Sequence, residues 1–410
     1  MNCRHCNTSL QHVVVDLVNA PLSNELINTA QLDEPIIFYP LKIFVCHNCF
    51  LMQVAEIKKA EEIFDNKYPY FSSYSPSWVK HAKDYVDMMM QKFRFDQNSF
   101  IIEIASNDGY LLQFFKNYKI PLLGIEPASN TATVAIQKGI PTIEKFFSYT
   151  LAKEEIVDKN RLADLVIGNN VLAHVPDINN FVAGIKLALK STGICTFEFP
   201  HLAKLLEYAQ FDTIYHEHFS YLSLTTVVTI FKKFGLEIFD VEELDTHGGS
   251  LRIYGKHQED HTREITLNVS KILKNEELCG IKDIRYYFDF QSRVNKIKYE
   301  VLTFLIQQKQ QQKKVIGYGA AAKGNTLLTY CGIKGNDLIQ FVVDASPHKQ
   351  NKYFPSSHIP IFGKENIDEY RPDYIVILPW NLKNEIMDMY SHVRSWGCKF
   401  VVFIPSLLIY

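Results

Sequence analysis

The chain has 410 residues, 47% of them hydrophobic, and a formal net charge of −2. This length exceeds what one ordinary core organises, so two or three domains are expected. The near-neutral charge excludes a general attraction to nucleic acid or to an anionic membrane surface. The sequence contains no apolar run of 18 residues and no apolar signal segment near Met1, so we expect a cytoplasmic protein without a membrane span.

Two CxxC pairs lie within the first 60 residues: Cys3 with Cys6, and Cys46 with Cys49. Each pair aims two thiolates at one point, and two such turns complete a tetrahedral zinc site. A redox dithiol would need only one pair. Four cysteine ligands leave no open position, so we expect a structural Zn²⁺ and not a catalytic one.

Beyond the cysteines, short apolar strands alternate with amphipathic helices, a pattern that predicts a parallel sheet covered on both faces. A stretch rich in Glu, Lys, Gln and Asn then predicts helices that act as a connector, and a second strand–loop–helix unit follows it. The predicted fold class is α/β, with an N-terminal zinc-binding module, a central Rossmann-like domain and a second Rossmann-like nucleotide-binding domain. The expected domain bounds are 1–65, 66–256 and 257–410.

The first buried strand of the central domain ends in the run Glu103 to Gly109, and the next ends at Glu126. Ligands of open α/β sheets bind at such strand ends, and an acidic residue after the second strand can accept both hydroxyls of a ribose. The loop lacks the G-x-G-x-x-G cradle of a pyrophosphate, which favours S-adenosylmethionine over a dinucleotide. The predicted cofactor-binding residues are Glu103, Ser106, Asn107, Gly109, Glu126, Asn169 and Asn170.

A short run, Tyr215 to His218, carries two histidines and a glutamate, and His174 follows a neighbouring predicted strand. A histidine paired with a carboxylate is held in one tautomer, as a general base requires. Glu217 and His218 would face opposite sides of a regular strand, so both reach one site only if the backbone turns. Metal binding by His216, His218 and His174 is the competing interpretation.

Two further segments carry polar groups suited to a ligand. Residues 68–78, with three tyrosines and four serines, fit either a lid over the site or an aromatic clasp between domains. The second Gly-rich turn suits phosphate binding through backbone N–H groups and a lysine, and an aspartate ends the next strand. The predicted substrate-binding residues there are Gly319, Lys323, Asn325 and Asp344.

In this order, the motifs resemble the nucleotide-sugar 3-C-methyltransferases of deoxysugar biosynthesis, over essentially the whole chain. The matching segments are the two CxxC pairs, "YFSSYS", "EIASNDGYLL", "GIEP", "NNVLAHVPD", "YHEHFSYLS", "HGGSLRIY" and "YGAAAKGNTLL". The first loop departs from the more usual glycine-rich form, with Ala105 where glycine is common. Alanine there should not prevent binding unless the backbone needs a positive φ.

The resemblance implies a transfer of a methyl from S-adenosylmethionine to C3 of a nucleotide-diphosphate 4-keto-6-deoxy sugar. It implies His218 as the base, assisted by Tyr215, Glu217 and His174, with Tyr70 lining the site and Tyr68 in reserve. Thymidine diphosphate is the nucleotide we expect, although the motifs do not distinguish it from cytidine or guanosine diphosphate. The sequence also leaves the oligomeric state open.

Three alternatives differ in chemistry from this prediction. A dinucleotide-dependent oxidoreductase would use both α/β domains but needs a pyrophosphate fingerprint. A non-catalytic zinc-knuckle protein would not need the Tyr/His/Glu/His set. A sugar O-methyltransferase would need no ketone, so activity on a 4-hydroxy analogue separates it from the predicted enzyme.

Overall fold

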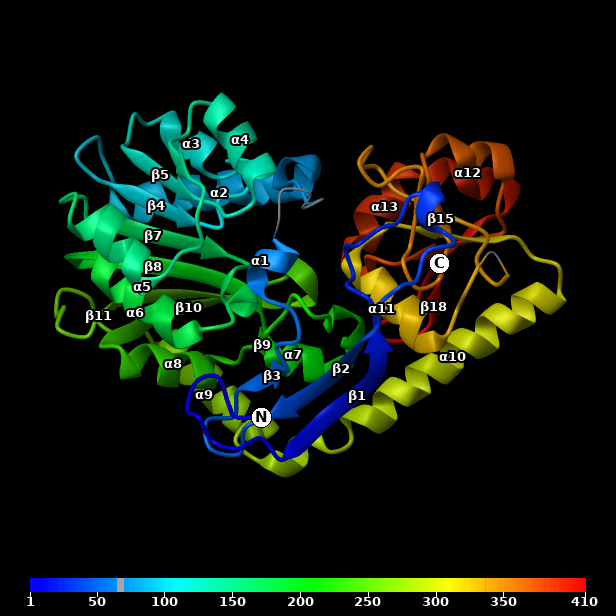
Figure 1. Ribbon diagram of the computed structural model, residues 1–410, viewed down its shortest axis with the longest axis horizontal. Helices are drawn as coiled ribbons and strands as arrows, with labels where there is room; N and C mark the ends of the chain where they lie inside the picture. Colours follow the sequence, from blue (N-terminus) through cyan, green and yellow to red (C-terminus); the bar gives the residue numbers. More distant parts are fainter. Residues whose placement is uncertain (65–69, 336) are drawn as a thin grey trace.

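The computed structural model describes residues 1–64, 70–335 and 337–410. Three parts are visible in Figure 1: a central domain on the left, a C-terminal domain on the right, and an N-terminal sheet below and between them. No helix in the described part of the chain has both the length and the apolar composition needed to cross a bilayer.

The central sheet has seven strands, and its order reverses beside the first of them. Its strands in spatial order are β6 (Thr142–Ile143), β5 (Leu122–Ile125), β4 (Ile101–Ile104), β7 (Ala163–Asn169), β8 (Leu189–Pro200), β11 (Ser250–His257) and β10 (Leu236–Leu244). Because the chain turns to opposite sides after β4, the loops that follow β4 and β7 separate and open a crevice at the carboxyl ends of these strands. The cofactor-binding residues predicted from the sequence lie at this switch point.

The sheet differs from the expected all-parallel arrangement at one strand. β11 runs antiparallel to β8 and to β10, whereas the other neighbouring pairs are parallel. A nine-residue strand followed by a tight turn at Gly248 and Gly249 returns β11 beside β10 as a hairpin. A hairpin needs no crossover helix, so the βαβ pattern could not reveal it.

Helices cover both faces of this sheet, because successive strand residues point to opposite sides. Ile101 packs against one helical layer and Ile102 against the other. The first layer is α2 (Pro76–Phe93), α3 (Leu112–Lys116) and α4 (Ser129–Gln137); the second contains α5 (Tyr149–Ala152), α6 (Ile178–Ala188) and α8 (Leu224–Lys233). This confirms the doubly covered sheet that the strand pattern predicts.

The C-terminal domain repeats the same plan. Its strands in spatial order are β14 (Lys352–Tyr353), β15 (Pro360–Phe362), β13 (Val342–Val343), β12 (Val315–Tyr318), β16 (Tyr374–Ile377), β17 (Lys399–Val402) and β18 (Leu408–Ile409). The order reverses between β12 and β16, so the Gly-rich loop after β12 opens at a second switch point. α11 (Ala322–Cys331) begins there, with α12 (Glu365–Tyr370) and α13 (Lys383–Met389) following later.

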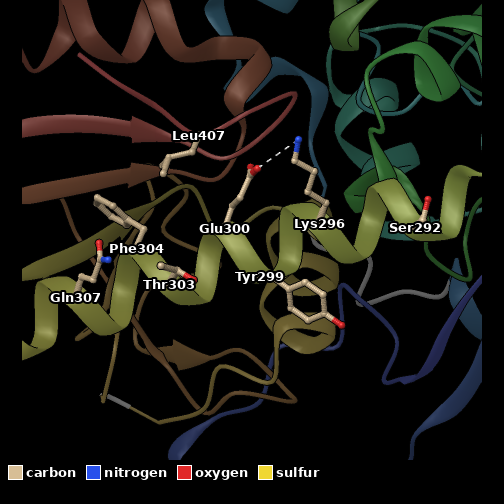
Figure 2. A pocket seen from close by; sticks show the side chains of 8 residues that line it. All are labelled: Ser292, Lys296, Tyr299, Glu300, Thr303, Phe304, Gln307 and Leu407. Carbon is tan, nitrogen blue, oxygen red and sulfur yellow. Dashed lines mark ion pairs between the residues drawn. The ribbon is translucent and has the colours of Figure 1, made fainter.

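The predicted helical connector is present as α9 (Leu267–Cys279) and α10 (Phe290–Gln310). A groove of about 420 Å³ opens along the outer face of α10, where Lys296 and Glu300 form an ion pair at 3.9 Å. Figure 2 shows that all but one of its side chains come from this helix: Ser292, Lys296, Tyr299, Glu300, Thr303, Phe304, Gln307 and Leu407. None of the predicted site residues lines this groove.

The N-terminal sheet joins the other two domains. Its strands are β1 (His12–Ala20), β2 (Tyr39–Val45), β3 (Met52–Val54) and β9 (Ser220–Tyr221), the last of which comes from the central domain and directly follows the histidine run. The apolar face of β1 and β2 shares one core with α10 and the C-terminal sheet. The cysteine end packs instead into the core of the central domain.

Candidate active site

Tyr215, His218 and His174 come together at the carboxyl end of the central sheet. The backbone at 215–218 is a turn, closed by a hydrogen bond from the His218 N–H to the Tyr215 carbonyl at 3.0 Å. The His218 ring centre lies 4.1 Å from that of Tyr215 and 4.7 Å from that of His174. The sequence analysis required a backbone turn if side chains from both sides of this run are to reach one site. That turn is present.

Backbone carbonyls fix the tautomer of both imidazoles. His218 Nδ1 lies 2.8 Å from the Thr213 carbonyl oxygen, and His174 Nδ1 lies 2.8 Å from the Glu217 carbonyl oxygen. A carbonyl only accepts, so each Nδ1 carries the proton and each Nε2 presents a lone pair. Burial lowers the pKa of His174 to about 4, and burial together with the neighbouring His174 lowers the pKa of His218 well below its usual value. Both rings are neutral, and basic at Nε2, at pH 7.

The expected histidine–carboxylate pair does not form. The Glu217 carboxylate accepts a hydrogen bond from Asn24 Nδ2 at 2.7 Å, so its partner belongs to the N-terminal module. Burial raises the pKa of Glu217 to about 7. The sequence placed a carboxylate next to the histidines correctly, but the turn directs it away from their rings and leaves its main-chain carbonyl to orient His174.

His216 does not join the other two histidines. Its Nε2 lies 3.2 Å from the Pro40 carbonyl, and its ring packs against Tyr39 at 5.9 Å. Within the described residues, the only group of three or more His, Cys, Asp and Glu side chains arranged to hold a metal is the four-cysteine cluster. The histidine metal site considered from the sequence is therefore not formed.

The segment with Tyr70 contacts both domains. Asn107 donates from Nδ2 to the Tyr70 carbonyl at 3.1 Å and accepts at Oδ1 from the Ser72 N–H at 2.9 Å. Tyr74 Oη lies 3.0 Å from His348 Nε2 of the C-terminal domain. These contacts form the aromatic clasp considered from the sequence. The Tyr70 side chain is 43% exposed, and Tyr68 lies outside the described residues.

Buried polar groups line the switch point of the central sheet. Within the described part of the chain, the Glu103 carboxylate, the Ser106 hydroxyl and the Asn169 amide make no hydrogen bond of ordinary geometry, and neither does Asn170 Oδ1. Buried polar atoms ordinarily have partners, so this set suits a polar ligand. An adenosine cofactor with hydroxyl, amine and carboxylate groups fits this donor and acceptor set.

Glu126 ties the first loop to the second strand. Its two carboxylate oxygens accept hydrogen bonds from the N–H groups of Asn107 and Ala128, both at 2.9 Å. Burial nevertheless raises its pKa to about 7. A carboxylate has about four lone-pair sites, so Glu126 can still accept a ribose hydroxyl while it holds the loop.

The loop after β4 does need a positive φ at Ala105. This residue adopts φ +56, and Asn107 adopts φ +49. Gly109 also has a positive φ, and a Cβ there would lie 2.4 Å from Ile140 Cδ1. Ala105 therefore has the positive φ that was named as the exception to our expectation that alanine is tolerated here. An L-residue other than glycine is strained in the left-handed region.

Ala105→Gly should raise the free energy of unfolding by about 0.5–1 kcal/mol, since glycine removes the left-handed strain at some cost in unfolded-state entropy. Urea unfolding of the ligand-free protein measures this. Ala128→Gly is the matched control, because Ala128 has φ −79 and should gain nothing. A fall in stability for Ala105→Gly would show that the loop is not strained at this residue.

The predicted C-terminal residues divide into two groups. Lys323 is half-buried at the second switch point, where Nζ donates to Asn381 Oδ1 at 2.7 Å and lies 4.8 Å from the Trp380 ring. Asn325 is fully buried, and its Nδ2 has no hydrogen-bond partner in the described chain. Both remain suited to a ligand.

Asp344 and Gly319 have structural reasons for their identity. The Asp344 carboxylate accepts from the N–H groups of Ala320 and Ser346 at 2.7 and 2.8 Å, so it organises the Gly-rich loop. A Cβ on Gly319 would lie 2.5 Å from Pro379 Cδ, and its φ is +90. Close packing on Pro379 therefore requires this glycine with or without a ligand.

Three contacts that the sequence did not predict organise this site, and the first two of them join the central and C-terminal domains. Asp212 accepts from Trp380 Nε1 at 2.8 Å across the domain boundary, and burial raises its pKa to about 6. Thr326 donates to the Ile214 carbonyl at 2.9 Å. His247 accepts at Nε2 from Asn170 Nδ2 at 3.0 Å. Of these residues, His247 and Thr326 lie in segments that the sequence analysis singled out, "HGGSLRIY" and "YGAAAKGNTLL".

The four cysteines of the CxxC pairs converge as predicted. Their sulfur atoms all lie within 4.8 Å of one another, with Cys3 to Cys49 and Cys6 to Cys46 at 3.5 Å. Sulfur ligands about 2.3 Å from a tetrahedral zinc are about 3.8 Å apart. The cluster therefore fits one Zn²⁺ with no position left for substrate.

The chain is 34% identical to C-methyltransferase NovU of Streptomyces niveus over 405 residues, which are 98% of this chain and 95% of that protein. It belongs to the C-methyltransferase family. Three family models match in succession: a zinc binding domain over 3–64, a methyltransferase domain over 80–241, and a C-methyltransferase C-terminal domain over 245–405.

Solved structures also match, and two of them each cover less than half of the chain. A S-adenosylmethionine-dependent methyltransferase from Clostridium acetobutylicum ATCC 824 is 11% identical, with a TM-score of 0.35, and covers 44% of this chain and 92% of its own. The PH0226 protein from Pyrococcus horikoshii OT3 is 13% identical, with a TM-score of 0.36, and covers 49% and 99%.

The protein is therefore a S-adenosylmethionine-dependent C-methyltransferase with a four-cysteine zinc cluster, as the resemblance implied. This membership favours the predicted enzyme over the oxidoreductase and over the non-catalytic zinc protein.

A buried neutral histidine makes the stability of this C-methyltransferase depend on pH. Between about pH 6.5 and pH 4 the unfolded chain binds a proton at residue 174 that the folded chain does not. As the pH is lowered through this range, this group should therefore lower the free energy of unfolding by at most about 1.4 kcal/mol per pH unit. Urea midpoints measured from pH 7 to pH 5 should fall less steeply for His174→Gln. An unchanged slope would contradict the buried neutral state.

Proposed function

We propose that the enzyme methylates C3 of a nucleotide-diphosphate 4-keto-6-deoxy sugar, most simply a dTDP sugar, through an enolate formed by His218. The observation that carries the proposal is the tautomer of His218: a neutral ring, protonated at Nδ1 by its bond to Thr213 and so basic at Nε2, that packs beside the rings of Tyr215 and His174. Such a group suits removal of a proton that a neighbouring ketone acidifies.

Tyr215 is the donor that supports the developing enolate oxygen. Burial, followed by the nearby Glu217 carboxylate, raises the pKa of Tyr215 well above its usual value, so the phenol keeps its proton at pH 7. One such hydrogen bond is typically worth roughly 3 kcal/mol in a transition state. His174 was expected to share this role, but while neutral it has no proton at Nε2. We instead assign His174 two other roles: it positions the His218 ring, and its Nε2 can accept a proton.

When bound, S-adenosylmethionine supplies an electrophilic methyl on its sulfonium. Glu103, Ser106, Asn107, Gly109, Glu126, Asn169 and Asn170 surround the switch point that would hold it. Lys323 at the second switch point is the candidate for the diphosphate, with the buried Asn325 in the same first turn of α11. Tyr70, Glu217, Asp344 and Gly319 stay predictions as residues that touch substrate.

The test is a reaction in deuterated water that contains S-adenosylmethionine and a dTDP-4-keto-6-deoxy sugar, followed by mass spectrometry. The expected product gains one methyl, and substrate recovered from a reaction without S-adenosylmethionine carries deuterium at C3. Methyl transfer to the 4-hydroxy analogue would support the O-methyltransferase instead. Binding of S-adenosylmethionine without methyl transfer or exchange would exclude this sugar as the substrate.

A further inference from the structure

Arg4 lies inside the first CxxC turn, between Cys3 and Cys6, yet its side chain leaves the cysteine cluster. Its guanidinium donates from Nη1 to the Pro176 carbonyl at 3.0 Å and from Nη2 to the Val54 carbonyl at 2.7 Å. These two acceptors belong to segments more than 100 residues apart in the sequence. One planar fork therefore joins these two segments.

One of these segments leads back to His174, and the other pairs with the backbone that directly follows His218. Pro176 ends the short loop that begins at the 3₁₀ turn Leu172–His174. The N–H of Val54 donates to the Phe219 carbonyl at 3.2 Å, and Phe219 directly follows His218. The Arg4 guanidinium also lies 5.4 Å from the centre of the Phe219 ring. Arg4 thus links the backbone next to His174 with the strand that pairs directly after His218, and its guanidinium lies near the Phe219 ring.

The bridge is itself held firmly. The Arg4 N–H donates to Gln53 Oε1 at 3.0 Å, and Asn179 Nδ2 donates to the Arg4 carbonyl at 3.3 Å. β3 pairs with β9 directly after the histidine run, so the contact with Val54 is made to a strand of the same sheet. Both the backbone and the guanidinium of Arg4 are therefore hydrogen-bonded. A shift of the cysteine turn would shift the segments next to the two histidines.

We infer that Arg4 is a positioning residue that sets the separation of the His174 and His218 rings. This inference rests on the proposed base role of His218. A displacement of about 1 Å at a catalytic group can cost about 100-fold in rate. A lysine at this position would keep the charge but lose the fork that reaches both carbonyls at once.

The test compares Arg4→Lys with Lys233→Gln. Lys233 donates to the His5 carbonyl in the same turn at 3.3 Å and contacts neither histidine segment, so it is the matched control. For Arg4→Lys we expect kcat to fall about 10- to 100-fold, with KM and S-adenosylmethionine affinity changed by less than about twofold. With histidine labelled at Cε1, the His174 and His218 resonances, assigned by His→Gln variants, should shift in Arg4→Lys and stay in place in Lys233→Gln.

The resonances need no substrate, so the inference and the proposed function can fail separately. Shifts confined to Arg4→Lys, in an enzyme that does not exchange the sugar C3 proton, would support the positioning role and exclude the proposed chemistry. If Arg4→Lys lowers only the unfolding temperature and leaves kcat and both resonances unchanged, Arg4 stabilises the fold alone and the inference is wrong. Recovery of kcat in Arg4→Ala by added guanidinium ion would support it further.

Discussion

His218→Ala should lower kcat by about 10²- to 10⁴-fold, which is the usual cost of losing a general base. The reason is structural: within the Tyr215–His218–His174 group, His218 touches both other rings, and its Nδ1 bond to Thr213 leaves Nε2 free to accept a proton. S-adenosylmethionine should still bind, because the cofactor crevice lies at other loops. Calorimetry measures binding, and mass spectrometry measures methyl transfer and exchange at C3.

His216→Gln is the matched control for this variant. It removes the same kind of side chain from the same run, but its Nε2 faces the Pro40 carbonyl and not the other histidines. We expect kcat within about threefold of the unmodified enzyme, since only a general base carries the larger factor. Equal losses in both variants would show that the run supports folding and that His218 is not the base.

Because the pKa of His218 is held well below its usual value, the acid limb of kcat/KM should lie below about pH 6.5.

Removal of zinc should lower the free energy of unfolding by about 5 kcal/mol or more, because binding to four thiolates is coupled to folding. The four sulfur atoms lie within 4.8 Å of one another, so without a cation the thiolates would repel one another or take up protons. Metal analysis should give one zinc per chain. Thermal unfolding before and after treatment with a chelator then measures the loss, and Cys46→Ser should reproduce it.

Cys279→Ser controls for the loss of a cysteine as such, because Cys279 is exposed and lies outside the cluster. Its unfolding midpoint should not change. Zinc removal should also abolish turnover, since β3 of the zinc module pairs with β9 directly after His218. A chelated protein that keeps both its stability and its turnover would show that the cluster is not structural. Acid should release the metal, because only the thiolate forms bind it.

Much of the local structure could be predicted because it depends on near neighbours in the chain. The strand β4, the helix α6 and the two CxxC turns follow from apolar spacing and from ligand type. The position of the β4 and β7 loops at the same edge of the sheet, with a crevice between them, follows from the parallel order of the strands. The hairpin that returns β11 antiparallel could not be derived, because two apolar strands joined by a turn leave their position in the sheet open.

The partners of the site residues were decided by the tertiary structure. Glu217 seemed placed to pair with a histidine, but Asn24, which is 193 residues away, holds its carboxylate. Trp380 meets Asp212 across two domains, and Arg4 reaches Pro176 from the zinc module. Residue types and spacing therefore determined by themselves the zinc ligands, the layered folds and the histidine run. Only the folded chain decided which group orients which, because hydrogen-bond partners depend on where distant segments return in space, and no local periodicity encodes that return.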